Sequence, residues 1–423
     1  MSLGRYPQVQ RPHHLQGLRT FYARGYGLLT LKDSLSAYCR EIEPWFHVIS
    51  IPRLQSQLPQ TWEEVSVDVV LLCLSIALLT TPPPSPSSPV AENGDGNGNG
   101  PWGFQTLYCQ VKNWISSTEA LGLNSCQLVQ ARILVTLYEV AHGLYPAAYI
   151  SIGATVNAAD ALTVHPGAGA AAQYPHAPGT DDETKREDGV LIWGGILILD
   201  RYIAVDSGPH PSLTRSRSQA IHDLLKPTLC PTHWHGQDPT DPICRLARLV
   251  EASFLLDKTH SILNSPTAEH TINIEELILT VQTIINLQTI LGEEVKDGVH
   301  LYAGGLSLCN AALLLAFENG TRVPPIAGST ENCNSMATES LASVLSTITS
   351  TVELFTLGTQ SVEFNVLRVP PFVTFLVYKA AAIVTKRLLV DTSSSGSDEE
   401  LGKLRLLRNF LKIMGARWLG CGK

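Results

Sequence analysis

Apolar positions three and four residues apart recur along most of this 423-residue chain. Over residues 128–145 they fall on one side of a helix, at Ile133, Leu134, Leu137, Val140, Ala141 and Leu144. That spacing matches the 3.6-residue turn of an α-helix. The same pattern predicts helices over 147–165, 273–291 and 397–418, and only 362–369 suggests a strand. An all-α fold is therefore expected.

Local signals mark where several of these helices begin and end. Gly143 and Pro146 punctuate the chain after the first helix. Asn273 is the expected N-cap of the helix over 273–291, with Glu276 three residues on. Ser397 and Glu400 form a second capping pattern, and acidic residues fill the first turn of that helix.

Two runs are predominantly apolar, at 69–79 and 371–384, and the second contains Lys379. Both are shorter than the roughly 20 residues that span a bilayer. We expect buried core helices here and no membrane association.

Three low-complexity stretches interrupt the helical pattern, near 81–100, 165–189 and 391–400. Their Pro, Gly, Ser and Asn content is typical of flexible insertions. The apolar helices on either side need one another for burial, so we expect a single large, irregular helical domain over 31–423. Residues 1–30 are expected to form an N-terminal extension.

Composition narrows the possible functions. Hydrophobic residues make up 44% of the chain and charged residues 16%, with a net charge of −8. This acidic balance argues against a surface that wraps nucleic acid. The nine cysteines lie at least fourteen positions apart, so most are expected to be reduced core thiols. No apolar run follows the N-terminus, so we expect an intracellular protein.

Short patterns that suggest chemistry are incomplete. Gly167 and Gly169 lack the preceding strand of a nucleotide-binding loop. Ser307 has Cys309 where a nucleophile elbow needs glycine. Residues 230–238 contain zinc-ligand types, namely Cys230, His233, His235 and Asp238, without the usual spacing. Neither a metal nor a cofactor is expected.

The C-terminal helix is basic after Glu400, at Lys403, Arg405, Arg408, Lys412 and Arg417. One interpretation is a surface for an acidic partner or a membrane. The simpler interpretation, which we favour, is an amphipathic helix with its basic face in water.

Asp200 and Arg201 stand inside the apolar stretch "LIWGGILILDRYIAVDSG". Adjacent helical residues point about 100° apart, so each needs its own partner. A buried arginine must be paired, and Glu139 is one candidate. We favour a structural pair over a catalytic one, because no nucleophile or base accompanies it in the sequence.

The segment from Gly189 to Gly208 closely resembles the fungal-specific transcription factor domain, the middle homology region of binuclear zinc cluster regulators. Matching positions there are Trp193, Leu199, Asp200, Arg201 and Gly208. The preceding segment is similar to the same family at Gln130, Gly143, Ala148, Tyr149, Gly153, Ala159, Leu162 and His165. With weaker similarity at both ends, the resemblance covers roughly residues 31–418.

The resemblance implies an all-helical regulatory domain in which the Asp-Arg pair is an interior structural feature. It also implies the nucleus as the location, with the cytoplasm as a second one. The family's six-cysteine zinc cluster is not found in this sequence, the arginines before Trp193 are missing, and Pro209-His210 replaces the expected Arg-Pro. Direct specific DNA binding is therefore not expected.

The first hypothesis is a non-enzymatic transcription regulator or co-regulator, of the kind that controls fungal secondary-metabolite gene clusters. Its partners would be a DNA-binding transcription factor or co-regulator and a small-molecule effector. The alternative is a helical small-molecule-binding protein or enzyme, with His142, His165, Asp200 and Arg201 converging on one pocket. A third hypothesis is a scaffold that forms homo- or heterodimers and titrates a full-length relative.

Overall fold

Thirteen α-helices and no strand are present in the described residues of the computed structural model. Those residues are 28–58, 65–83, 104–162, 180–208, 210–215, 242–294, 299–322, 331–357, 368–390 and 397–422. The prediction of an all-α fold is confirmed. The candidate strand over 362–369 lies mostly outside the described residues, and Arg368 and Val369 are not in a strand.

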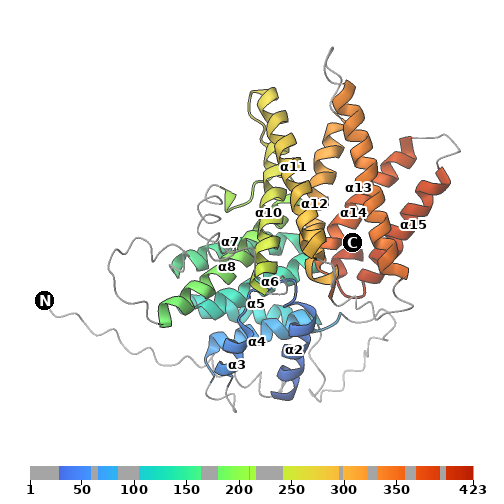
Figure 1. The fold of residues 1–423 in the computed structure, drawn as a ribbon. Coiled ribbons are helices and arrows are strands. Elements are labelled where there is room, and N and C mark those ends of the chain that lie inside the picture. Colours follow the sequence, from blue (N-terminus) through green and yellow to red (C-terminus); the bar gives the residue numbers. More distant parts are fainter. Residues whose placement is uncertain are drawn as a thin grey trace.

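The first seven helices form the lower and left part of the molecule in Figure 1. Helix α6 packs against α4, α5, α7 and α8, and α2 packs on α4. The bounds are α2 Leu28–Glu41, α3 Ile51–Gln57, α4 Val67–Thr80, α5 Phe104–Ala120, α6 Cys126–Ala141, α7 Tyr145–Ala161 and α8 Thr180–Asp206.

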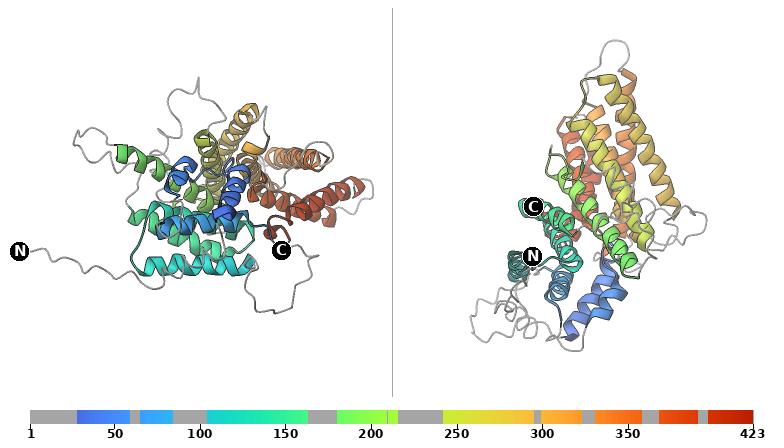
Figure 2. Two further views of the ribbon diagram at one scale, coloured as in Figure 1. Left: turned by 90° about the horizontal axis from the view of Figure 1, so that it is seen from below. Right: turned by 90° about the vertical axis from the view of Figure 1, so that its left-hand side faces the viewer.

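The remaining helices lie above that group, as the right-hand view of Figure 2 shows. Helix α10 packs against α8, α11 and α12, while α14 packs against α12 and α15. The bounds are α10 Pro242–Asn264, α11 His270–Glu294, α12 Val299–Gly320, α13 Glu331–Leu357, α14 Pro371–Val390 and α15 Ser397–Met414. A short 3-10 helix, Leu419–Gly422, returns the chain to α6.

Helices α4 and α6 form the centre of the core. Every residue of α4 from Val69 to Leu79 is buried, and so is every residue of α6 from Leu128 to Ala141. A helix that is enclosed on all sides needs apolar residues all round, which explains the continuous run in α4. The prediction of a buried core helix over 69–79 is confirmed.

Gly143 ends α6 for a specific conformational reason. Its φ is +67°, and the amides of Gly143 and Leu144 donate to the carbonyls of Val140 and Glu139. This is a Schellman motif, in which glycine takes the left-handed position without steric cost. Pro146 then occupies the first turn of α7, so it begins a helix as well as interrupting one.

The predicted insertion over 165–189 is too long. Helix α8 already begins at Thr180, and residues 163–179 lie outside the described residues. Its first turns are held by Arg53 of α3, which donates to Asp188 at 2.6 Å and forms an ion pair with Glu187. Charged residues thus extend the helix beyond the apolar stretch visible in the sequence.

The other two insertions and the N-terminal extension lie largely outside the described residues. Residues 84–103, 391–396 and 1–27 are not described, so these predictions stay untested there. The prediction over 391–400 is wrong at its end, because 397–400 form the first turn of α15. The first described helix begins at Leu28, slightly before the predicted domain start.

The predicted N-cap of α11 is wrong. This helix begins at His270, so Asn273 lies within its first turn. The Asn273 side chain instead fixes the incoming chain, accepting from the Thr267 amide and donating to the Thr267 carbonyl. An asparagine can satisfy backbone groups on either side of a helix start, which makes the sequence signal ambiguous.

Helix α11 exposes much of its apolar surface. Ile278 and Leu279 are 51% and 60% exposed, while Ile284 on the same helix is fully buried. Among the described residues, Thr271–Glu294 is the one segment long and apolar enough to cross a membrane, and only 22% of its most apolar window is buried. A single such helix is weak evidence for a membrane span, because core helices of soluble proteins pass the same test.

The C-terminal helix packs through Leu407, Phe410 and Met414, with Trp418 fully buried beyond its end. Arg405, Arg408 and Lys412 are exposed, as expected for a basic face in water. Arg417 is an exception, because it is only 2% exposed. Its guanidinium donates to the Leu79 carbonyl at 2.9 Å and lies over the Trp418 ring.

Candidate functional site

Asp200 is buried in α8 and receives three hydrogen bonds from the segment over 210–215. Its carboxylate accepts from the Leu213 amide at 3.0 Å, the Thr214 amide at 2.8 Å and the Thr214 hydroxyl at 2.6 Å. Burial raises the pKa of Asp200, and these hydrogen bonds oppose the rise. Both carboxylate oxygens therefore hold the chain that follows α8.

Arg201 points to a different neighbour, helix α10. It is fully buried, and its guanidinium donates to the Val250 carbonyl at 3.2 Å and the Ser253 hydroxyl at 2.9 Å. The guanidinium also lies 5.4 Å from the centre of the Phe254 ring, a cation–π distance. Burial lowers the pKa of Arg201 to about 10.

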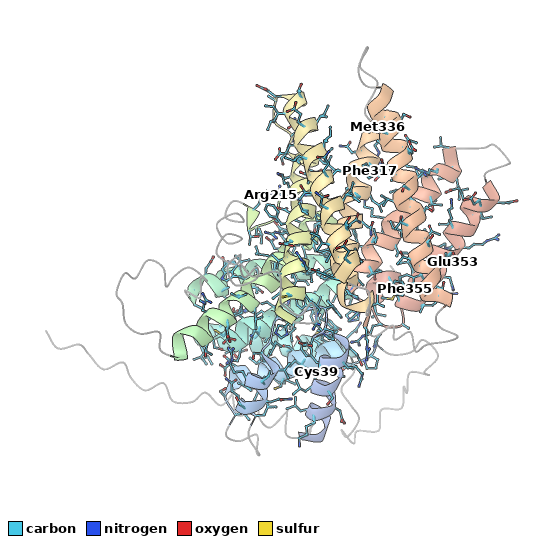
Figure 3. All side chains as sticks on the ribbon, in the orientation of Figure 1. Cys39, Arg215, Phe317, Met336, Glu353 and Phe355 are labelled. Carbon is cyan, nitrogen blue, oxygen red and sulfur yellow. The ribbon has the colours of Figure 1, made fainter. Side chains whose placement is uncertain are left out.

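A second set of polar contacts closes the same junction. Arg215, labelled beside α10 in Figure 3, donates to Asp257 at 2.6 Å and to His260 Nδ1 at 3.2 Å. The other ring nitrogen of His260 donates to the Gly208 carbonyl at 2.7 Å. Because Arg215 can only donate, Nδ1 must be the acceptor and the ring is neutral.

This arrangement, which we call the α8–α10 junction, comprises Asp200, Arg201, Gly208, Leu213, Thr214, Arg215, Ser253, Asp257 and His260. It joins α8, the segment over 210–215 and α10. Neighbouring side chains of α8 reach separate partners because adjacent helical residues diverge by about 100°. The contacts fix a tertiary junction, and the polar groups of Asp200 and Arg201 face protein atoms.

The prediction that Glu139 is a partner of the Asp200–Arg201 pair is wrong. Glu139 is buried in α6, where its carboxylate accepts from Lys112 at 2.6 Å and Tyr108 at 2.7 Å, both from α5. Sequence showed that buried charges need partners, but several acids were available. The packing of α5 on α6 determines that the partners of Glu139 are Lys112 and Tyr108.

The other residues that carry the family resemblance have separate positions. Trp193 is fully buried, and Gln130 donates to the Val48 carbonyl at 3.0 Å. Gly153 on α7 faces Leu213, and Gly208 has a φ of +105° after α8. His165 lies outside the described residues.

His142 does not join Asp200 and Arg201. It caps the end of α6, where Nδ1 accepts from the Leu419 amide at 3.2 Å. Its ring lies 4.3 Å from Tyr138 and 5.9 Å from Trp418. The structure therefore places the described members of the suggested pocket in separate core environments.

The weaker chemical patterns are distributed as follows. Ser307 lies within α12 and donates back to the Ala303 carbonyl, while Gly304 allows Leu249 to approach closely. Residues 165–172 and 230–238 lie outside the described residues. No potential metal cluster of three His, Cys, Asp or Glu occurs in the described part of the chain.

The cysteine prediction is only partly correct. Seven cysteines are described and all have free thiols, but only Cys73 and Cys309 are buried. Burial raises the pKa of both thiols to about 12, which keeps them protonated at neutral pH. Cys109 is exposed on α5.

Sequence reasoning missed a cavity of about 1160 Å³ along α14 and α15. Tyr145, Tyr202 and Asp206 are among its lining residues, and Tyr145 is hydrogen-bonded to both other side chains. Burial raises the pKa values of all three groups. The only sequence signal was the basic face of the last helix, which gave no indication of a concave surface.

A second cavity of about 500 Å³ lies between α12, α13 and α14. Phe317 and Phe355 mark its upper and lower parts in Figure 3. Its lining is apolar with small hydroxyl groups from α13, including Ser340 and Thr347.

No protein-family model, curated protein or solved structure matches this chain. The family resemblance therefore depends on the order and spacing of the motif residues alone.

Proposed function

We propose that this protein is a non-enzymatic transcription regulator or co-regulator whose helical domain acts through a DNA-binding partner. The motif residues resemble a fungal regulatory domain, and control of a secondary-metabolite gene cluster is the process this resemblance suggests. The nucleus is the proposed location, with the cytoplasm as a second one, and homo- or heterodimers are proposed assemblies.

The observation that carries the proposal is the α8–α10 junction. A catalytic site needs polar groups that converge on a substrate. Asp200 is instead occupied by Leu213 and Thr214, and Arg201 by α10. This supports a structural role for the pair, as the resemblance implies, and it disfavours the enzyme hypothesis in the form that used these residues.

A tethering experiment tests the proposal. Residues 1–423 are fused to an unrelated DNA-binding domain, and a reporter is compared with that of the DNA-binding domain alone. We expect clear activation or repression. An unchanged reporter, with the fusion nuclear, soluble and as abundant as the control, would contradict the proposal.

Two variants separate a folded regulatory domain from a nonspecific effect of the fusion. Arg201→Ala removes a buried group of the junction and should abolish the reporter response together with folding. Arg322→Ala changes an exposed arginine that pairs with Glu318 on the same helix turn, so it should preserve both. A response that survives unfolding by Arg201→Ala would not come from this domain.

Small-molecule binding remains the second candidate function, and the large cavity favours it. Helices α14 and α15 supply most of its lining, and Gly143, Tyr202 and Asp206 from the segments that carry the family resemblance line it too.

A further inference from the structure

We propose that the groove between α14 and α15 is a binding site for a small amphipathic organic anion, with an apolar chain and one anionic head group. The inference rests on the second candidate function, small-molecule binding at this cavity, and names the class of ligand; it does not depend on a role in transcription. Three features of the groove carry it: its size, its apolar walls and its predominantly positive charge.

The groove is large enough to enclose most of a small molecule. Its volume of about 1160 Å³ is slightly above the roughly 300–1000 Å³ typical of ligand sites. The residues of α14 that line it recur at helical spacing, including Phe375, Tyr378 and Ala382. One continuous helix face therefore forms a wall of the groove.

The walls are mostly apolar. Phe375 is buried below the groove, whereas Tyr378 on the same face is 60% exposed. Leu404 and Leu411 of α15 form the opposite wall and are half-buried. Burying this surface under an apolar chain is favourable in proportion to the area removed from water.

Positive charge predominates in the lining. Lys386 of α14 and Arg405, Arg408 and Lys412 of α15 all line the groove, and all four are exposed. None of these four forms an ion pair with an acid among the described residues. Lys403 contrasts with them, because it pairs with Glu399 and Glu400. The four unpaired cations therefore have free capacity for an anion.

Negative charge among the described lining residues is limited to one side chain. Asp206 is the only acid that lines the groove, and it is hydrogen-bonded to Tyr145. An anionic head group is repelled there and attracted to Arg405, Arg408 and Lys412, while the apolar chain lies against α14. The excess of basic over acidic side chains in the lining thus favours a ligand with a negatively charged head group.

Calorimetric titration of the full chain with decanoate tests this assignment, using decanol and decyltrimethylammonium as neutral and cationic ligands with the same chain. We expect decanoate to bind most tightly of the three. Its affinity should fall with added salt, because its head group contacts exposed charges. Decanol should bind more weakly and without salt dependence. Tighter binding of the cation would overturn the proposal, and so would no binding of decanoate.

Two groove variants and one control locate the site. The triple variant Arg405→Gln/Arg408→Gln/Lys412→Gln should lower the affinity for decanoate at least tenfold and leave the affinity for decanol unchanged. Ala382→Trp, at an exposed lining position, should weaken both ligands by filling the groove. Lys32→Gln/Arg186→Gln/Arg322→Gln removes the same charge elsewhere and should change neither affinity.

Circular dichroism should show every variant to be folded, because each change is at an exposed position. Equal decanoate affinity in the groove triple variant and the wild type would overturn the site. An acidic amphipathic helical peptide is the competing occupant. If it binds with dependence on the same three cations while decanoate does not, the groove is a protein-docking surface and the proposal is wrong.

Discussion

Charged residues in the interior of this protein are each held by a particular neighbour. Arg201 donates to α10, Asp200 accepts from the segment over 210–215, and Glu139 accepts from α5. An unpartnered buried charge costs several kcal/mol, so these contacts restrict which helices can pack together. Their contribution is to specify the arrangement as well as to stabilise it.

Replacing Arg201 with methionine should lower the free energy of unfolding by about 1–3 kcal/mol, the cost of leaving buried hydrogen-bond acceptors without their donor. Methionine keeps the apolar volume but leaves the Val250 carbonyl and Ser253 hydroxyl without this donor. Urea unfolding measures the change. The exposed Arg405→Met should shift stability by less than about 0.5 kcal/mol, and equal losses in both variants would refute the argument.

His260 should make stability fall on mild acidification. Burial is the main cause that lowers its pKa, and the Arg215 guanidinium beside Nδ1 adds to it. Below about pH 6.5, His260 therefore binds a proton in the unfolded chain but stays neutral in the folded protein. As the pH falls, the free energy of unfolding decreases by up to about 1.4 kcal/mol per pH unit until the pKa of His260 in the folded protein is reached. Above about pH 6.5 this decrease is absent.

The measurement is the free energy of unfolding between about pH 7.5 and 5.5. In His260→Phe this part of the pH dependence should disappear, because no proton is taken up at that position. His210→Phe, at an exposed histidine, should retain it. An unchanged profile in His260→Phe would show that another group is responsible.

At the scale of elements, the end of α6 depends on one backbone conformation. Gly143 has a positive φ, and the turn it forms brings the chain to Pro146 and α7. The 3-10 helix near the C-terminus packs against this end of α6. A Cβ atom added to Gly420 would lie 2.9 Å from the Ala141 carbonyl oxygen. Two segments distant in sequence thus require a bare backbone here.

Gly143→Ala should lower the free energy of unfolding by about 1–2 kcal/mol, because an L-residue is disfavoured at this φ. Gly402→Ala is the matched control within α15, where a new methyl group meets no atom within 4 Å. It should raise stability by about 0.5–1 kcal/mol through helix propensity. Thermal unfolding compares the two, and the same sign in both would contradict the conformational explanation.

For the whole molecule, the most unusual feature is the apolar surface of α11. The helix packs on α10 and α12 through Ile284, Leu287 and Leu291, yet much of its other surface is isoleucine and leucine. Contiguous apolar patches on a soluble surface promote association. The low fraction of charged residues, 16%, offers little to counter it.

Ile278→Glu/Leu279→Glu should reduce concentration-dependent association in sedimentation velocity and change the unfolding free energy by less than about 0.5 kcal/mol. Both side chains are exposed, so the new charges meet water. Ile284→Glu, on the buried side of the same helix, should instead unfold the protein. Unaltered association in the double variant would mean that copies of the protein do not associate through the exposed face of α11.

The sequence by itself determined the fold class, several of the helices and part of the interior. Helical spacing is local, so it identified α6, α7 and α15, and the unbroken apolar run identified α4 as buried. It also required separate partners for Asp200 and Arg201, because helix geometry fixes the angle between adjacent side chains.

Only the tertiary structure decided which helices satisfy those requirements. The partner of Glu139, the burial of Arg417 and the early start of α8 each depend on a residue from a distant segment, such as Lys112, Leu79 or Arg53. The groove of α14 and α15 likewise closes against residues of α6, α7 and α8. A periodic pattern states which side of a helix is buried, but long-range packing selects its neighbour.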